Sequence, residues 1–176
     1  MATITALSEG RVKFTILTTK PANPAAPTVT ELNAGIDASC RILASDFTWT
    51  TTDSDKTQEK VLCAEGNANS LGASNYSAGV TALRYWDSST LAADVTGDAV
   101  FEALRVKGTT VWAYARETAK KSTAAWAAGD EIYLGGEVVT DEPQKPSEAG
   151  GAIKRRIPME MQLGYTNIEV AATGGA

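Results

Sequence analysis

The sequence contains no histidine, and its only cysteines are Cys40 and Cys63. Histidine is the commonest general base and metal ligand, so an enzyme built on this chain would depend on carboxylates, lysine, tyrosine or hydroxyl groups. The adjacent acidic pairs at 130–131 and 141–142 do not form a carboxylate dyad within a strand, because neighbouring side chains point to opposite faces. We therefore predict no enzyme activity, no cofactor and no bound metal. Two cysteines are too few for a disulfide scaffold, and we expect both to be small buried thiols.

Basic residues and long apolar runs are also scarce. Sixteen lysines and arginines stand against 21 aspartates and glutamates, which gives a net charge of −5. This balance argues against a surface built mainly to neutralise nucleic acid phosphates, although it leaves room for a local basic patch. No apolar run approaches the roughly 20 residues that a transmembrane helix needs, and the first residues lack a signal-peptide pattern. We expect a chain that is made and folded in a cytoplasm, with no membrane anchor.

What the sequence does contain is a series of short alternating segments. Its 176 residues, 43% of them hydrophobic, suit one domain with one substantial core. A helical stripe of apolar residues lies between Asp98 and Gly108. Alternation of apolar and polar residues predicts strands near 11–17, 40–44, 76–86, 110–117, 132–140, 153–163 and 166–170. We predict a mainly β fold, a two-sheet β-sandwich or partly closed barrel with one flanking α-helix.

Two segments at the N-terminal side of the chain are distinctive. In residues 11–17, Val12, Phe14 and Ile16 are expected to face the core, with Lys13 and Thr15 on the opposite, solvated face. Residues 18–36 contain three prolines and are predicted to form an extended, irregular arm with one helical turn near its end.

Residues 47–61 are predicted to form a long hairpin with a polar tip. The run 48–52 is β-branched, Asp53–Ser54–Asp55 is turn chemistry, and residues 57–63 are expected to return as the partner strand. The start of a calcium loop is also matched here, but Gln58 and Ala64 stand where that loop needs glycine and a bidentate glutamate. The candidate contact residues of this hairpin are Thr50, Thr51, Thr52, Asp53, Ser54, Asp55 and Lys56.

The strand predicted at 153–163 carries a proline and a charged residue on unusual positions. Pro158 cannot donate to a ladder, so the strand is expected to lie at a sheet edge or to be bulged there. Arg155 falls on the otherwise apolar face and needs a carboxylate or carbonyl partner if it is buried. The apolar face itself comprises Ile157, Met159, Met161 and Leu163.

Lys154, Arg155 and Arg156 form the densest basic cluster in the chain. Strand alternation places Arg155 opposite its two neighbours, and no aromatic residues are interleaved to stack on bases. A structural or interface charge pairing is favoured over nucleic acid binding. The acidic pair Asp141 and Glu142, beyond the Pro/Gly-rich connection at 143–152, supplies candidate partners within the chain or on a neighbour.

Five segments together resemble the major tail protein, or tail tube protein, of long-tailed actinobacteriophages. The similarity runs in order from about residue 10 to residue 171. The segments are "NPAAPTVTELNAGIDASCRIL", "YSAGVTALRYWD", "VWAYARETAKK", "AAGDEIYLGGEVVTDEPQ" and "IKRRIPMEMQ".

The resemblance implies a structural virion protein, with 1–176 as one tail tube domain. Two packed sheets with a flanking helix would form hexameric rings that stack into a tube for genome ejection. Subunits would be bridged by the arm at 18–36, the hairpin at 47–61 and part of 140–176, with a flexible tail at 172–176. Implied partners are the chain itself, a tape-measure protein in the lumen, and terminator and baseplate proteins, while DNA passes without specific binding. Assembly would take place in the bacterial cytoplasm, and the product would reside in the virion tail.

A different class remains open on the residues alone. A monomeric carbohydrate-binding or adhesive β-sandwich is also rich in threonine and would use tryptophans as stacking platforms. Core or interface packing is the preferred interpretation for most of these tryptophans. The four candidates are Trp49, Trp86, Trp112 and Trp126.

Overall fold

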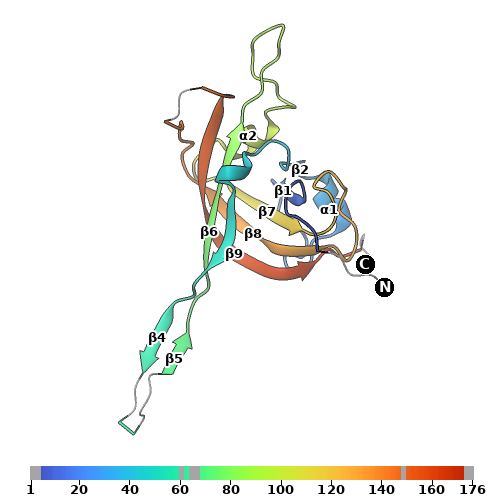
Figure 1. Cartoon of the computed structure of the whole chain (residues 1–176). Coiled ribbons are helices and arrows are strands. Elements are labelled where there is room, and N and C mark those ends of the chain that lie inside the picture. Colours follow the sequence, from blue (N-terminus) through green and yellow to red (C-terminus); the bar gives the residue numbers. More distant parts are fainter. Residues whose placement is uncertain (1–4, 60–61, 64–67, 148–149, 173–176) are drawn as a thin grey trace.

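A computed structural model describes residues 5–59, 62–63, 68–147 and 150–172. These residues form a mainly β structure with a rounded body and two projections at opposite ends (Figure 1). Two short α-helices and a 3-10 turn accompany the strands. In chain order, the elements are β1 (Val12–Leu17), α1 (Val29–Ala34), β2 (Ile36–Asp37), η1 (Ala44–Asp46), β3 (Thr48–Thr52), β4 (Lys56–Glu59), β5 (Ala68–Leu71), β6 (Asn75–Leu83), α2 (Ala99–Leu104), β7 (Thr110–Glu117), β8 (Glu131–Thr140) and β9 (Lys154–Glu169).

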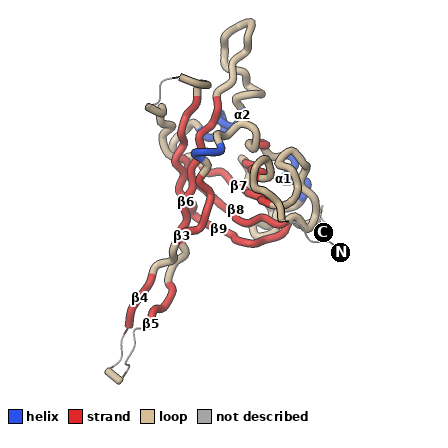
Figure 2. The backbone as a smooth tube through the Cα atoms, viewed as in Figure 1, coloured by secondary structure: helices blue, strands red, loops and turns tan. Residues whose placement is uncertain are grey.

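Seven strands form one antiparallel sheet in the order β2-β1-β7-β8-β9-β6-β3. The sheet curls so that β3 lies over β1, and the Phe14 ring meets Trp49 edge-on with centroids 4.9 Å apart. Trp49 Nε1 also donates to the Leu134 carbonyl of β8 at 2.9 Å. Because β2 and β3 are not paired to each other, the barrel stays open. The predicted mainly β fold is confirmed, and Figure 2 shows how the strands curve around the core.

Apolar side chains pack on both faces of this sheet. The first cluster fills the curled interior and includes Phe14, Trp49, Val80 and Ile157. The second cluster lies where α1 and the β7–β8 connection cover the sheet, and its members are Leu17, Leu32, Trp112, Tyr114, Trp126, Ile132 and Val170. Burial on two faces explains why a simple half-buried pattern was misleading for some strands.

The solvated face expected for residues 11–17 is wrong. Lys13 is 4% exposed and Thr15 is 1% exposed, because the second cluster covers that face of β1. The Lys13 ammonium group is paired with Asp37 at 2.6 Å, and Thr15 accepts a hydrogen bond from Trp126 Nε1 at 2.8 Å. Both polar groups therefore have the partners that burial demands.

The arm at 18–36 contains the helical turn that the sequence predicts. Thr28 caps α1 by accepting a hydrogen bond from the Glu31 N–H, and the Glu31 carboxylate accepts in return from the Thr28 N–H. Such a capping box satisfies two N–H groups that a helix start leaves free. Leu32 is 1% exposed against the sheet of its own chain, and Asn33 bonds both the N–H and the carbonyl of Trp126.

The strand pairing expected for the long hairpin is wrong. β3 pairs with β6, whereas β4 pairs with β5 as a separate two-stranded extension, which we call the β4–β5 arm. Asp53 and Asp55 lie at the base of this arm and not at its tip, where the Asn75 side-chain amide donates to the Asp53 carbonyl and the Asp55 carboxylate. Part of the predicted partner strand, residues 60–61, lies outside the described residues.

The C-terminal strands also differ from the prediction. Residues 153–163 and 166–170 belong mostly to one strand, β9, which lies between β8 and β6 and not at an edge. Glu137 pairs with Leu163 while Val138 pairs with Met161, so β9 carries an extra residue between these positions. This bulge turns the Leu163 side chain out of the core and leaves it 49% exposed. The predicted burial of Leu163 is therefore wrong.

Pro158 is tolerated inside the sheet because of where β8 ends. Its carbonyl accepts from the Asp141 N–H at 2.9 Å, one residue beyond the last residue of β8. Proline has no N–H to donate, and the hydrogen bond that it cannot form therefore falls at the end of the β8–β9 ladder. The prediction of an edge or a bulge at Pro158 is wrong, since the bulge of β9 lies several residues away.

Candidate assembly surfaces

The open seam of the curled sheet is a candidate contact surface. A hollow of about 730 Å³ lies there between residues of β3 and β1. Its lining combines the aromatic residues Phe14, Phe47 and Trp49 with the carboxylates of Glu9 and Glu117. Beside it, β3 is an edge strand, and edge strands present unpaired backbone groups to other chains.

Asp141 has a partner that the sequence did not indicate. Lys107, between α2 and β7, places its ammonium group 3.0 Å from the Asp141 carboxylate. A hydrogen bond from the Glu142 backbone and this ammonium group lower the pKa of Asp141 below its ordinary value. The hydrogen bond and charge of Asp141, with a smaller contribution from the charge of the exposed Glu142, raise the pKa of Lys107. Within the chain, both acids therefore interact with Lys107.

The basic cluster sits at the start of β9, opposite the end of β6. Arg155 pairs with Ala82, so it lies on the core side as predicted, half-buried, and donates to the Lys154 carbonyl at 2.8 Å. Arg156 is exposed, and its backbone forms two hydrogen bonds with Gln144. Among the described residues, neither arginine forms an ion pair. A pairing of these arginines across subunits stays a prediction.

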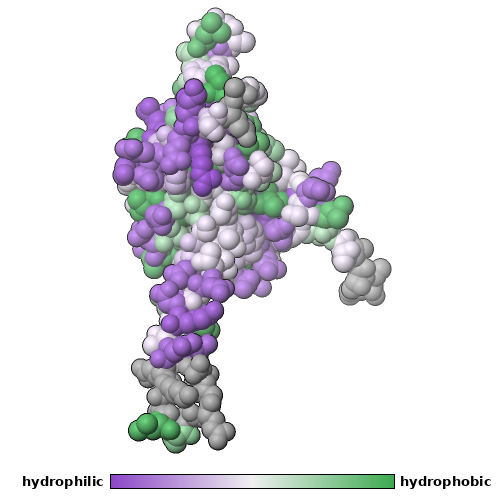
Figure 3. Space-filling view, turned by 60° about the vertical axis from the view of Figure 1, so that its left-hand side comes forward, coloured by the Kyte–Doolittle hydropathy of each residue, from purple (hydrophilic) through white to green (hydrophobic). Residues whose placement is uncertain are grey.

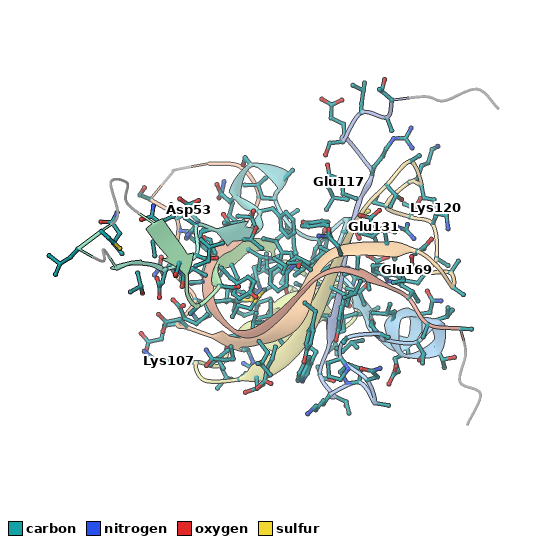
Figure 4. The ribbon with its side chains drawn as sticks, turned by 90° about the horizontal axis from the view of Figure 1, so that it is seen from below. Asp53, Lys107, Glu117, Lys120, Glu131 and Glu169 are labelled. Carbon is teal, nitrogen blue, oxygen red and sulfur yellow. The ribbon has the colours of Figure 1, made fainter. Side chains whose placement is uncertain are left out.

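The candidate hairpin residues are divided between the sheet and the arm. Thr50, Thr51 and Thr52 continue the β3 edge as exposed side chains, while Asp53 and Lys56 form an exposed ion pair at 3.2 Å. Figure 4 places Asp53 and the end of the molecule that bears Glu117, Glu131 and Glu169 on opposite sides. An exposed pair of this kind stabilises little, so these residues are available for contacts with another chain.

Among the described residues, two buried ion pairs and a third pair whose lysine alone is buried hold the body together, and sequence reasoning did not find them. Arg116 is fully buried and places Nη1 2.6 Å from the Asp130 carboxylate, while also donating to three carbonyls of the β7–β8 connection. Arg84 binds Asp98 at 2.7 Å beside α2, and the Lys13–Asp37 pair was described above. A lone base inside an apolar alternation, as in "VWAYARE", is the signal that predicts such a pair.

The tryptophans do not form an exposed stacking platform. Trp49, Trp112 and Trp126 are all less than 5% exposed, whereas Trp86 is 44% exposed. The preference for core packing is confirmed for three of the four, and the ligand-binding alternative keeps only Trp86. In the part of the chain that the structure describes, no group of three or more acidic or cysteine side chains is placed to hold a metal ion.

The two cysteines are exposed and unpaired by any disulfide. The expectation of buried thiols is wrong for both. Cys63 lies on the connection between β4 and β5, and Cys40 precedes η1, so neither occupies a strand position that faces the core.

The sequence was compared with models of known protein families and with curated proteins. A sequence model of the family described as phage tail tube protein matches residues 1–174, nearly the whole chain. No curated protein matches the sequence with significance. None of the helices in the described ranges is long and apolar enough to cross a membrane.

Proposed function

The chain belongs to the phage tail tube protein family, and from that premise we propose that it forms hexameric rings that stack into the tail tube of a long-tailed actinobacteriophage. The tube conducts the genome into the host during ejection. Family membership itself establishes a structural tail protein of the virion. Ring formation, stacking and passage of DNA are the proposal.

The observation that carries this proposal is the open, curled sheet. Its two edge strands, β2 and β3, are not paired to each other, and a hollow lined by residues of β1 and β3 lies at the unclosed side. A ring of copies would cover such edges by joining each sheet to the next around a common axis, which removes the risk of uncontrolled edge pairing. The tube is thus a way to complete a sheet that one chain leaves incomplete.

The charge of the chain suits a conduit. With a net charge of −5 and exposed threonines and acids, a wall built from these subunits repels phosphate and does not retain passing DNA. The proposed partners are other copies, a tape-measure protein within the lumen, and terminator and baseplate proteins at the ends. Assembly takes place in the host cytoplasm, and no cofactor takes part.

We assign the contacts between subunits to the arm at 18–36, the hairpin region with Thr50–Lys56 and part of 140–176. The first residues of the arm and the hairpin region are largely exposed, whereas α1 already packs on the sheet of its own chain. Since Lys107 already binds Asp141, the exposed Arg156 and the half-buried Arg155 are the bases left for carboxylates of another copy. Glu142, exposed beside Asp141, is one such acceptor.

Electron microscopy tests the function directly. Negative staining of the concentrated protein should show hollow tubes with sixfold end views. Immunogold labelling of virions that carry this sequence should mark the tail shaft along its whole length. Label confined to the capsid or to the tail tip would contradict the proposal, whether or not the purified chain assembles unaided.

A shortened variant separates folding from assembly. Asp55 and Gly72 are hydrogen-bonded across the base of the arm at 2.7 Å, so residues 56–71 can be replaced by an Asn-Gly turn that joins them. We expect a monomer with wild-type far-UV circular dichroism and a thermal midpoint within a few degrees, but no tubes. Normal tubes from this variant would show that the arm is not needed for assembly.

A further inference from the structure

The hollow at the open seam, which we call the seam hollow, has an aromatic lining that is fixed in place. Phe14 packs edge-on against both Phe47 and Trp49, with ring centroids 5.1 and 4.9 Å apart. The Trp49 indole is held in addition by its hydrogen bond to the Leu134 carbonyl. A hollow of about 730 Å³ that combines an apolar lining with a few polar groups is typical of a binding site.

Glu117 and Glu9 supply the charge of the seam hollow. Both side chains are exposed and line it, and Ser8 donates a hydrogen bond to the Glu117 carboxylate. Tyr133 also lines the hollow, and its pKa is raised by burial and further by the negative charge of Glu117, so this carboxylate lies close to the aromatic lining. Among the described residues that line the hollow, none is a lysine or an arginine.

The bases on either side of Val12 are directed to other groups. Arg11 donates to the Ala119 carbonyl, and the Lys13 ammonium group lies 2.6 Å from the Asp37 carboxylate. The seam hollow therefore suits a cation from outside the chain. Aromatic rings and carboxylates both attract a cation, and the aliphatic stem of a lysine packs well on an apolar lining. The ligand class is an alkylammonium group.

Lys20 is an exposed base beside the other edge of the sheet. It lines a smaller hollow of about 280 Å³ together with Ile36 of the edge strand β2. Its ammonium group lies 5.6 Å from the centroid of the Trp112 ring and, among the described residues, forms no ion pair. The Glu31 carboxylate, which lines the same smaller hollow, accepts from the N–H groups of Ala22 and Thr28. The charge of Lys20 is therefore available to another chain.

The surface of the body favours a contact through a few inserted side chains. On the face shown in Figure 3, hydrophobic atoms form small areas between polar ones, and no wide apolar area is seen there. In such interfaces, a small number of side chains that enter pockets supply most of the binding energy. A lysine that enters an aromatic and acidic hollow is a contact of this kind.

We infer that the seam hollow binds the Lys20 side chain of a second copy, with the ammonium group at Glu117 and Glu9 and the stem against the aromatic lining. β3, which borders the hollow, and β2, beside Lys20, are the two edge strands of the sheet. The contact joins two different surfaces of identical chains, so it repeats from copy to copy as a ring requires. This inference rests on the proposed function and names the side chain and the site that join neighbours within a ring.

The seam hollow can be tested on dilute monomer with two small probes. n-Butylammonium reproduces the lysine side chain, and n-butanol has the same stem without a charge. n-Butylammonium should shift the amide NMR signals of Phe47, Thr48 and Trp49 to saturation, and n-butanol should bind about tenfold more weakly. Glu117→Gln should remove most of this preference, whereas Glu131→Gln, which alters an exposed acid outside the hollow, should keep it. Equal affinities of the two probes for the wild type would overturn the inference.

Cross-linking of assembled tubes tests the occupant. A carbodiimide activates a carboxylate, and a lysine amine then displaces the activated group to form an amide, while the carbodiimide takes up the oxygen and leaves as a urea. The cross-linked multimers should contain Lys20 joined to Glu117 or Glu9. Lys20→Arg keeps the charge but has no reactive amine, so its tubes should form without this link. Wild-type tubes whose cross-links do not include Lys20 would overturn the inference and leave the proposed function intact.

The assembly concentration gives a readout without cross-linking. Lys20→Met keeps an apolar stem and removes the charge, so the protein concentration needed for tube formation should rise about tenfold. The urea midpoint of the monomer should stay unchanged, because Lys20 is exposed. Arg105→Met, which removes an exposed base at the end of α2, is the control and should leave the assembly concentration unchanged.

The outcomes separate the two proposals. An equal response of Lys20→Met and Arg105→Met would contradict a specific role for Lys20, although tubes would still form. If tubes are absent from every preparation and from virions, the proposed function falls and the inference falls with it.

Discussion

The buried pair of Arg116 and Asp130 allows a quantitative prediction for Asp130→Asn. Arg116 is fully buried and Asp130 is 5% exposed, with their charged atoms 2.6 Å apart. Removing one charge of a buried pair leaves the other uncompensated, which typically costs about 3–5 kcal/mol. Two features reduce the cost, because asparagine keeps an acceptor oxygen for Arg116, and Lys120, the second base that binds Asp130, is half-exposed to water. We therefore expect a loss at the lower end of that range, about 3 kcal/mol of unfolding free energy.

The loss should be visible as a shift in the thermal midpoint. At about 2–4 °C per kcal/mol for a chain of this size, the midpoint falls by about 6–12 °C. Far-UV circular dichroism of dilute monomer at pH 7, with urea unfolding alongside, measures it. Asp53→Asn removes the carboxylate of an exposed pair with Lys56 and should change stability by less than about 0.5 kcal/mol. A change below about 1 kcal/mol for Asp130→Asn would refute the reasoning.

The pH dependence gives the same prediction a second check. Burial raises the pKa of Asp130, but hydrogen bonds from Lys120, the Ala127 N–H and Arg116 outweigh it, so this pKa lies below its ordinary value. A lowered folded-state pKa contributes stability above the unfolded value of about 3.9 and loses it as the pH falls through the folded value. The stability difference between wild type and Asp130→Asn should be constant from pH 5 to 8 by this argument and shrink below about pH 4.

Two further predictions concern the sheet and the thiols. A Cβ on Gly136 would lie 1.9 Å from the Leu163 carbonyl oxygen, so Gly136→Ala should disturb the β8–β9 pairing and cost at least about 2 kcal/mol in urea unfolding. Gly79→Ala is the control, since its nearest neighbour would be 3.7 Å away, and a similar loss in both would contradict the packing argument. Cys40 and Cys63 should react with a thiol reagent as fast in the native protein as in urea, and strong protection of either would contradict its exposed position.

Local patterns in the sequence predicted several elements correctly. The alternation in 110–117 and 132–140 indicated β7 and β8, and the helical turn expected near the end of the arm is present as α1. These features depend on neighbours along the chain, which is why spacing alone identifies them. The same spacing also placed Arg155 on the core side of its strand.

Strand partners were predicted less well. The polar run after Thr52 looked like a hairpin turn, but β3 pairs with β6, which begins beyond the entire β4–β5 arm. Two short strands separated by polar residues have the same pattern whether they pair with each other or with a distant strand. Pairing is decided by which edges meet in the assembled sheet, and a single sequence does not encode that choice locally.

Burial showed the same limit at individual residues. Lys13 looked solvated because it alternates with apolar residues, yet α1 and the β7–β8 connection cover the face on which it lies. Leu163 looked buried, yet the bulge of β9 turns it outward. In both cases a contact with a distant segment reversed what the local period indicates.

The sequence by itself determined the strand-rich fold class, the absence of histidine chemistry, the acidic balance and the family to which the chain belongs. The first three follow from composition and periodicity, whereas the family follows from similarity along nearly the whole sequence, and none of the four requires knowledge of distant contacts. Only the tertiary structure decided that the sheet stays open between β2 and β3, that Lys107 binds Asp141, and that β6 pairs with both β3 and β9. Each of those facts depends on segments far apart in the chain meeting in space, and the energy of such meetings is set by packing.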